Sequence, residues 1–286
     1  LKKQVLPNII ILLFGINNVS SFIGLNSKAE QEDNSNLKIL SYNVRLFNKY
    51  NWLDEVNVYN KITNFIDKES PDIVCIQEFF VKDTTPSLNY KYHHIGIQDK
   101  KGKSHMAIYS KYNQINKETV TIKGEKMNNI CIFSDIVVKE DTLRVYNLHL
   151  ASNWFNSSDY SFIQKPKKSE IKKGLLGISE RMRVSFKKRA NEASIIRKHI
   201  DSSPYPVILC GDFNDTPMSY SYNKIKGELS DAFCLSGKGT GNSYVKIPTL
   251  RIDYIMHDKH INSINFKTHN LILSDHYAIS CEITNP

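Results

Sequence analysis

Short apolar runs recur along the chain and predict buried β-strands. They are rich in Ile, Leu and Val, which favour strands, and most are too short to be helices. Six such runs lie at 37–42, 73–77, 143–148, 207–210, 251–256 and 271–273. Further strands are predicted at 105–110 and 130–138.

Two stretches have the period of a helix instead. Within 55–66, Val58, Ile62 and Ile66 fall on one helix face, and a longer helix is predicted over 175–200. Strands that alternate with helices, with some strands paired as hairpins, predict an α/β fold on a mixed sheet rather than a purely parallel one. With 286 residues, 41% of them hydrophobic, the chain can bury a large core, which excludes a disordered protein.

Each of the six runs ends in, carries or leads into polar residues of one chemical kind. These residues are Asn43, Glu78, His149, Asp212 with Asn214, Asp253, and Asp275 with His276. A single polar residue at a strand end is ordinarily a turn or cap residue. Carboxylates, carboxamides and imidazoles at six strand ends instead predict a rim that supplies oxygen ligands and proton carriers. A divalent-metal phosphoesterase needs this set.

These motifs resemble those of the endonuclease/exonuclease/phosphatase superfamily. That group includes pancreatic-type deoxyribonucleases, apurinic-site endonucleases, neutral sphingomyelinases and inositol-polyphosphate 5-phosphatases. The motifs occur in the family's order: Ser-Tyr-Asn-Val-Arg at 41–45, Ile-Gln-Glu at 76–78, Asn-Leu-His-Leu at 147–150, Gly-Asp-Phe-Asn at 211–214, Arg-Ile-Asp-Tyr-Ile at 251–255 and Ser-Asp-His at 274–276. The resemblance covers 37–286 and implies a four-layer α/β sandwich, in which two packed mixed β-sheets are flanked by helices.

The resemblance also implies a metal site that holds Mg²⁺ or Mn²⁺. Glu78 is then the primary metal carboxylate, with Asn43 beside it and Asp275 in the same cluster. Asp212 would orient and deprotonate the attacking water, and Asn214 would hold that water or a phosphoryl oxygen. The five cysteines show no CxxC or Cys/His spacing, so nothing in the sequence indicates zinc.

Two histidines and an arginine complete the expected site. His276 is the best candidate to contact the scissile phosphate, and Asp253 could orient a histidine through a hydrogen bond. His149 would act from the opposite side, as an acid or as a phosphate clamp. Arg45 is expected either to pair with the carboxylates or to bind the phosphate.

The N-terminal region differs from the rest. We assign 1–25 to a hydrophobic segment, 26–36 to a polar linker and 37–286 to the catalytic domain. Residues 5–23 carry no charge and follow Lys2 and Lys3, which fits a transmembrane helix, a signal peptide or a peripheral helix. By the positive-inside rule, a membrane-anchored chain would place its catalytic domain on the non-cytoplasmic side.

The positive charge is local and leaves the substrate open. The net charge is +9, and residues 165–189 hold ten basic and two acidic residues, a net of +8. This stretch could bind nucleic acid or anionic lipid headgroups. Alternatively, it could be a solvated helix face, with the basic residues from Arg181 to Arg189 in water and the apolar residues Val184, Ala193 and Ile196 on the buried side. Asn-Leu-His-Leu resembles the deoxyribonuclease, sphingomyelinase and 5-phosphatase branches rather than the apurinic-site endonucleases.

The sequence therefore predicts a metal-dependent hydrolase of phosphodiesters, either a nuclease or a phospholipid phosphodiesterase. The rival interpretation is a non-catalytic, membrane-associated module on the same fold that binds anionic lipid or nucleic acid.

Overall fold

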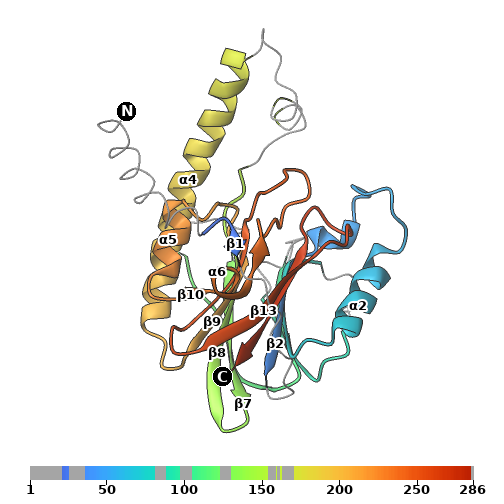
Figure 1. The fold of residues 1–286 in the computed structure, drawn as a ribbon, viewed down its shortest axis with the longest axis vertical. Coiled ribbons are helices and arrows are strands. Elements are labelled where there is room, and N and C mark those ends of the chain that lie inside the picture. The colour runs from blue at the N-terminus through green and yellow to red at the C-terminus, as the bar shows by residue number, and fades with distance from the viewer. Residues whose placement is uncertain are drawn as a thin grey trace, which may run out of the picture.

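The computed structural model describes residues 21–25, 36–80, 88–96, 105–122, 130–153, 159, 162 and 171–284. In this part of the chain, two six-stranded sheets pack face to face, and helices cover their outer faces (Figure 1). The predicted sandwich of two mixed sheets flanked by helices is confirmed.

The first sheet has the strand order β13-β14-β2-β3-β5-β4. Its central pair, β2 and β3, is parallel, and the other neighbours are antiparallel. Its strands are β2 (Leu37–Asn43), β3 (Ile73–Phe79), β4 (Tyr92–Gly96), β5 (His105–Ser110), β13 (Asn262–His269) and β14 (Ala278–Thr284).

The second sheet has the order β10-β12-β9-β8-β7-β6 and repeats this plan. The parallel pair is β8 and β9, again with antiparallel neighbours. Its strands are β6 (Asn113–Thr119), β7 (Ile130–Val138), β8 (Asp141–His149), β9 (Val207–Asp212), β10 (Ser230–Asp231) and β12 (Asp253–His257).

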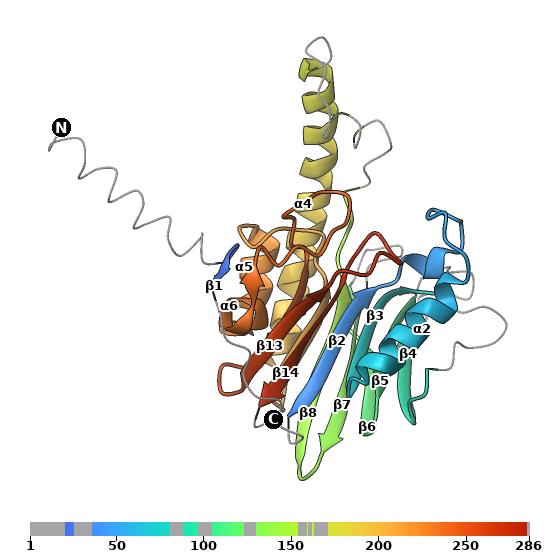
Figure 2. The ribbon, with the colours of Figure 1, turned by 45° about the vertical axis from the view of Figure 1, so that its right-hand side comes forward.

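Strand alternation divides the apolar residues among three layers of core. Between the sheets, the inward residues of both pack together, for example Ile39, Cys75 and Ile208. On the outer face of the first sheet, α2 (Val58–Glu69) buries Val58, Ile62 and Ile66. α4 (Ile171–Asp201) and α5 (Tyr220–Lys226) cover the second sheet (Figure 2).

Three short elements complete the described part: η1 (Arg45–Asn48), α6 (Ala232–Ser236) and the small sheet of β1 (Gly24–Leu25) with β11 (Lys238–Gly239). β1 is the end of the hydrophobic segment predicted for 1–25, and Ser21 to Leu25 pack against the domain. Residues 1–20 and 26–35 lie outside the described residues. Among the helices of the described part, none is long and apolar enough to cross a membrane.

The predicted elements correspond to observed ones with one clear exception. The run 271–273 is not a strand, and Leu271 and Ile272 are 41% and 51% exposed. Asp275 and His276 therefore do not follow a strand but precede one, β14. Three apolar residues indicate a strand only if they pair, and this run has no ladder partner.

A buried amide pair joins the two sheets. Gln77 Nε2 on β3 donates a hydrogen bond to Asn147 Oδ1 on β8 at 2.7 Å. Asn147 Nδ2 donates in turn to the carbonyls of Ile76 and Ala107, both at 2.9 Å. Both amide side chains are 0% exposed. Because hydrogen bonds are directional, this contact fixes how far one sheet can slide over the other.

Replacing this amide should destabilise the domain and impair the site. Asn147→Leu leaves Gln77 and two carbonyls short of a partner, so we expect the free energy of unfolding to fall by about 3 kcal/mol. Urea titration followed by circular dichroism measures it. Asn113→Leu, on the exposed start of edge strand β6, is the matched control and should change stability by less than about 0.5 kcal/mol. Equal effects of the two substitutions would show that the amide pair is not a structural determinant.

Candidate active site

One rim of the sandwich collects the predicted site residues from both sheets. Four strands end there: β2 at Asn43, β3 just past Glu78, β8 at His149 and β9 at Asp212. Two antiparallel strands begin there, so their residues arrive from the other direction. Asp253 opens β12 directly opposite Asp212, and Asp275 and His276 lie just before β14.

Glu78 reaches the rim because β3 is irregular at this point. Val74 and Ile76 face α2, and regular alternation would place Glu78 on the same face. Instead, the pairing with β5 shifts between Ile76 and Phe79, Glu78 has a φ of 49°, and Phe79 packs on the α2 side. This β-bulge releases the Glu78 carboxylate toward the site.

Asp212 lies at the centre, between two imidazoles. Its Oδ2 is 3.5 Å from His149 Nε2 and 3.6 Å from His276 Nε2. Its Oδ1 accepts a hydrogen bond from the backbone N–H of Asn214 at 2.8 Å. Burial raises the pKa of Asp212 to about 6, although the His276 charge opposes this. The carboxyl group is therefore more basic than an exposed aspartate.

His276 is held by a second carboxylate. Its Nδ1–H donates to Asp253 Oδ2 at 2.8 Å, and its ring packs edge-on against Tyr244, with 5.2 Å between ring centroids. Burial alone would lower the pKa of His276, but the charges of Asp253 and Asp212 outweigh it and raise the pKa to about 10. At neutral pH, His276 therefore carries a positive charge and directs its Nε2–H toward the pocket.

Two asparagines fix the orientation of the carboxylates. Asn43 Nδ2 donates to Asp212 Oδ2 at 3.0 Å and to Glu78 Oε1 at 3.3 Å, so it links the two sheets at the rim. Asn214 Nδ2 donates to the Leu150 carbonyl at 3.0 Å and to Asp212 Oδ2 at 3.3 Å. Asn214 has a φ of 51°, in the left-handed region that Asn tolerates better than most residues.

Arg45 pairs with the carboxylate of Asp275, the first of the two interactions expected for it. The distance from Arg45 Nη1 to Asp275 Oδ2 is 3.3 Å, and the guanidinium lies 4.4 Å from the centroid of the Trp52 ring. Ser274 Oγ donates to the Asn43 carbonyl at 2.7 Å, which ties the Ser-Asp-His segment to the end of β2. Arg45 therefore holds Asp275 in place at the pocket edge.

The donor chemistry of this rim fits a divalent cation. Four carboxylates converge, those of Glu78, Asp212, Asp253 and Asp275, beside Arg45 and protonated His276, and Lys246 also interacts with Asp275. Asp212, Asp253 and His276 place one ligand atom each within 4.8 Å of one another. All three residues of this triad are buried, so a hydrated ion has less access to them than to the two remaining carboxylates.

Glu78 and Asp275, predicted as metal ligands, are more accessible to a divalent cation than the triad is. Their side chains are 28% and 14% exposed, so a hydrated ion can reach them, and both line the pocket. Asn43 turns its Nδ2 toward the carboxylates here, and ligation by Asn43 would require the opposite amide orientation. Glu78 and Asp275 thus carry the metal prediction, and Asn43 supports it through Glu78.

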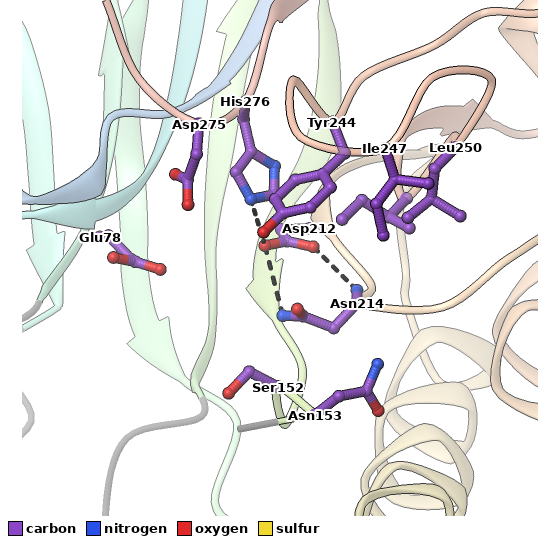
Figure 3. Close-up of a pocket in the computed structure, with 11 residues that line it drawn as sticks. Glu78, Ser152, Asn153, Asp212, Asn214, Tyr244, Ile247, Leu250, Asp275 and His276 are labelled. Atoms are coloured by element: carbon purple, nitrogen blue, oxygen red, sulfur yellow. Dashed lines mark hydrogen bonds and ion pairs between the residues drawn. The ribbon is translucent and has the colours of Figure 1, made fainter. Parts of the chain in front are cut away.

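The pocket itself adds residues that the sequence analysis missed. It has a volume of about 270 Å³. Besides the predicted site residues and Ile252 of the Arg-Ile-Asp-Tyr-Ile motif, the pocket is lined by Ser152, Asn153, Tyr244, Ile247 and Leu250 (Figure 3). These five lie in segments without strand or helix periodicity, where the sequence gives no signal of burial or of a site.

Arg189 is an exception to the alternative in which this basic stretch is a solvated helix face. It is fully buried, with Nε 3.0 Å from Asp215 Oδ2, and it donates to the Ala151 carbonyl at 2.7 Å and to Asn153 Oδ1 at 3.0 Å. Burial lowers the pKa of the Arg189 guanidinium, opposed by the Asp215 charge. Val184, expected on the apolar side, is 58% exposed, whereas Ala193 and Ile196 are buried as predicted.

Removing the Arg189 charge should therefore destabilise the wall of the pocket. Arg189→Met leaves the buried Asp215 carboxylate unpaired, and we expect the free energy of unfolding to fall by about 3–5 kcal/mol. Denaturant titration measures the change. Arg183→Met, on the same helix in an exposed pair with Glu180, should leave the free energy of unfolding close to that of the wild type, because solvent screens this pair. A loss for Arg189→Met no greater than that for Arg183→Met would contradict the assignment.

Comparisons with known proteins agree with this geometry. The Endonuclease/Exonuclease/phosphatase family matches residues 40–276. No curated protein matches the sequence significantly. The fold is similar to that of D. rerio TDP2 complexed with single-strand DNA product, with a TM-score of 0.63, 16% identity, and coverage of 88% of this chain and 100% of the other.

Two further solved structures have similar folds. One is a mannosyl-6-phosphatase from Bacteroides thetaiotaomicron, with a TM-score of 0.64, 18% identity and coverage of 87% and 99%. The other is the human Nocturnin catalytic domain with bound sulfate, with a TM-score of 0.64, 17% identity and coverage of 92% and 96%. With its motifs assembled at one rim of the expected sandwich, this chain belongs to the Endonuclease/Exonuclease/phosphatase family.

Proposed function

We propose that this chain is a divalent-metal-dependent hydrolase of phosphodiester bonds. Members of its family are hydrolases that act on phosphoester bonds. The observation that carries the proposal is the position of Asp212. This buried, basic carboxylate lies between two imidazoles in a pocket edged by Glu78 and Asp275.

The geometry suggests a role for each group. The Asn214 N–H donates to Asp212 Oδ1, and the side-chain amides of Asn43 and Asn214 donate to Oδ2. The carboxylate is thus held in the pocket wall, where it can take a proton from an attacking water. His276, positively charged and held by Asp253, neutralises charge that builds on the phosphoryl oxygens. His149 lies on the other side of Asp212 and can contact the phosphate or protonate the leaving oxygen. A cation on Glu78 and Asp275 would supply further electrophilic charge.

The structural neighbours support a phosphate-ester substrate without choosing among classes. One is bound to a DNA product, one is named as a sugar phosphatase, and one holds a sulfate anion. Both candidate classes, nuclease and phospholipid phosphodiesterase, use the same hydrolytic step. The membrane-anchored location on the non-cytoplasmic side stays a prediction, because it depends on residues 1–20.

Asp212→Asn should abolish catalysis without unfolding the protein. The amide cannot accept the proton of the attacking water, so we expect kcat for bis(4-nitrophenyl) phosphate with Mg²⁺ to fall by about 10²- to 10⁴-fold. Asp141→Asn, the same substitution at the exposed far end of β8, should retain full activity. Thermal denaturation confirms folding. An active Asp212→Asn enzyme would contradict the role, and an inactive wild type would favour the non-catalytic binding module.

Activity should depend on a divalent cation held by Glu78. EDTA should remove the activity, and Mg²⁺ or Mn²⁺ should restore it. In Glu78→Gln, the Mg²⁺ concentration for half-maximal rate should rise at least about tenfold, because a charged ligand is lost. Glu140→Gln, in the exposed turn before β8, is the control. Full activity in EDTA, or an unchanged Mg²⁺ requirement in Glu78→Gln, would refute the metal site.

A further inference from the structure

The active-site pocket has one charged side and one apolar side. Glu78 and Asp275 lie to one side of Asp212, and Ile247 and Leu250 lie to the other (Figure 3). In the proposed function, hydrolysis of the phosphoester uses the charged side. The apolar side has no part in that step.

A second cavity adjoins the apolar side. It has a volume of about 340 Å³, and Ile247 and Leu250 line both cavities. The remaining wall includes Phe22 and Ile23 from the N-terminal segment, together with Pro248. None of the described residues that line this side cavity carries a charge. Its size and lining are those of a site for an apolar group.

The catalytic segment itself holds one wall of the side cavity. The Val245 N–H donates to the Asp275 carbonyl at 2.9 Å, and the Tyr277 N–H donates to the Ser243 carbonyl at 2.8 Å. The chain then turns back, and the Leu250 carbonyl accepts from the N–H groups of Ser243 and Tyr244. Ile247 and Leu250 are thus set at a fixed distance from His276.

The N-terminal segment holds the opposite wall. Gly24 and Leu25 pair with β11, and Arg251 Nη2 donates to the Ser21 carbonyl at 2.6 Å. Arg251 is buried and also bonded to Asp231, so Phe22 and Ile23 are fixed between two anchors. Ile23 nevertheless remains 43% exposed, so a ligand in the cavity would cover apolar surface that now faces water.

We propose that this side cavity binds the apolar arm of the phosphodiester substrate, an alkyl, acyl or aryl group esterified to the phosphate. This inference rests on the proposed function and narrows its substrate class. The phosphate lies at the charged side, and the ester arm passes over Ile247 and Leu250 toward Phe22 and Ile23. A nucleotide fits this cavity less well. Its base edge and neighbouring phosphate need polar or charged partners, and the polar side chains among the described lining residues are threonines.

A homologous series of 4-nitrophenyl alkyl phosphates tests the proposal. The leaving group stays constant while the alkyl arm grows from methyl to octyl, below micellar concentrations and with Mg²⁺ present. Each methylene that enters the cavity should raise kcat/KM about three- to fourfold, until the cavity is filled. Equal kcat/KM for the methyl and hexyl esters would overturn the inference and leave the proposed function intact.

Substitutions in the lining of the side cavity then test whether the apolar arm binds there. In the double variant Phe22→Ser/Ile23→Ser, the hexyl-to-methyl ratio of kcat/KM should fall toward one. Thr240→Trp, which fills the cavity from its rim, should do the same if the double variant folds poorly. Leu25→Ser is the control, because Leu25 is 85% exposed in the same segment, and it should keep the wild-type ratio. A wild-type ratio in folded Phe22→Ser/Ile23→Ser or Thr240→Trp would exclude this cavity.

Binding measurements distinguish a failure of this inference from a failure of the proposed function. If no ester is hydrolysed, the proposed function fails, and calorimetry with hexylphosphonate and methylphosphonate still tests the cavity. Hexylphosphonate should bind at least about tenfold more tightly, and equal affinities would refute the subsite. Hydrolysis of the octyl ester in solution would support the subsite, and so would hydrolysis of phosphatidylcholine in vesicles. Hydrolysis in vesicles would also identify a bilayer lipid as the source of the apolar arm.

Discussion

The position of one sheet over the other is the constraint on which the site depends. Asn43 and Glu78 come from the first sheet, and His149, Asp212 and Asp253 come from the second. A strand advances by about 3.3 Å per residue, so a slip of one residue would break the hydrogen bond from Asn43 to Asp212, which spans 3.0 Å across the rim. Apolar packing tolerates such slips better than directional bonds do. The buried hydrogen bond between Gln77, which immediately precedes Glu78, and Asn147, two residues before His149, is a directional contact that resists such a slip.

Buried carboxylates have different partners behind the site and at its centre. Behind it, fully buried arginines neutralise carboxylates: Arg189 pairs with Asp215 and Arg251 with Asp231. Within it, imidazoles take the place of arginine beside Asp212. The structural pairs keep the walls rigid, and the Arg45–Asp275 pair does the same at the pocket edge. Asp212 instead contacts two imidazoles, and Asp253 holds one of them, His276, in its charged form.

The sequence predicts the charged half of the site well because strands order it. An apolar run followed by a carboxylate or imidazole marks a strand end, and parallel strands in adjacent positions bring such ends together. The bulge at Glu78 is not predictable in this way, because the motif Ile-Gln-Glu contains neither glycine nor proline. Likewise, the apolar run 271–273 resembles a strand but has no pairing partner, and Arg189 resembles other exposed basic residues until Asp215 is seen beside it.

The apolar half of the pocket is not predictable from the sequence, and the physical reason bears on substrate specificity. Tyr244, Ile247 and Leu250 lie on a loop whose shape comes from hydrogen bonds to the Asp275–Tyr277 backbone, not from its own periodicity. Its side chains can change without disturbing the strand ladders that position Asp212 and His276. Loops on a rigid scaffold are where binding preference resides in many folds. In the proposed function, reaction chemistry and substrate preference are therefore encoded in different parts of this chain, which meet at the ring contact between Tyr244 and His276.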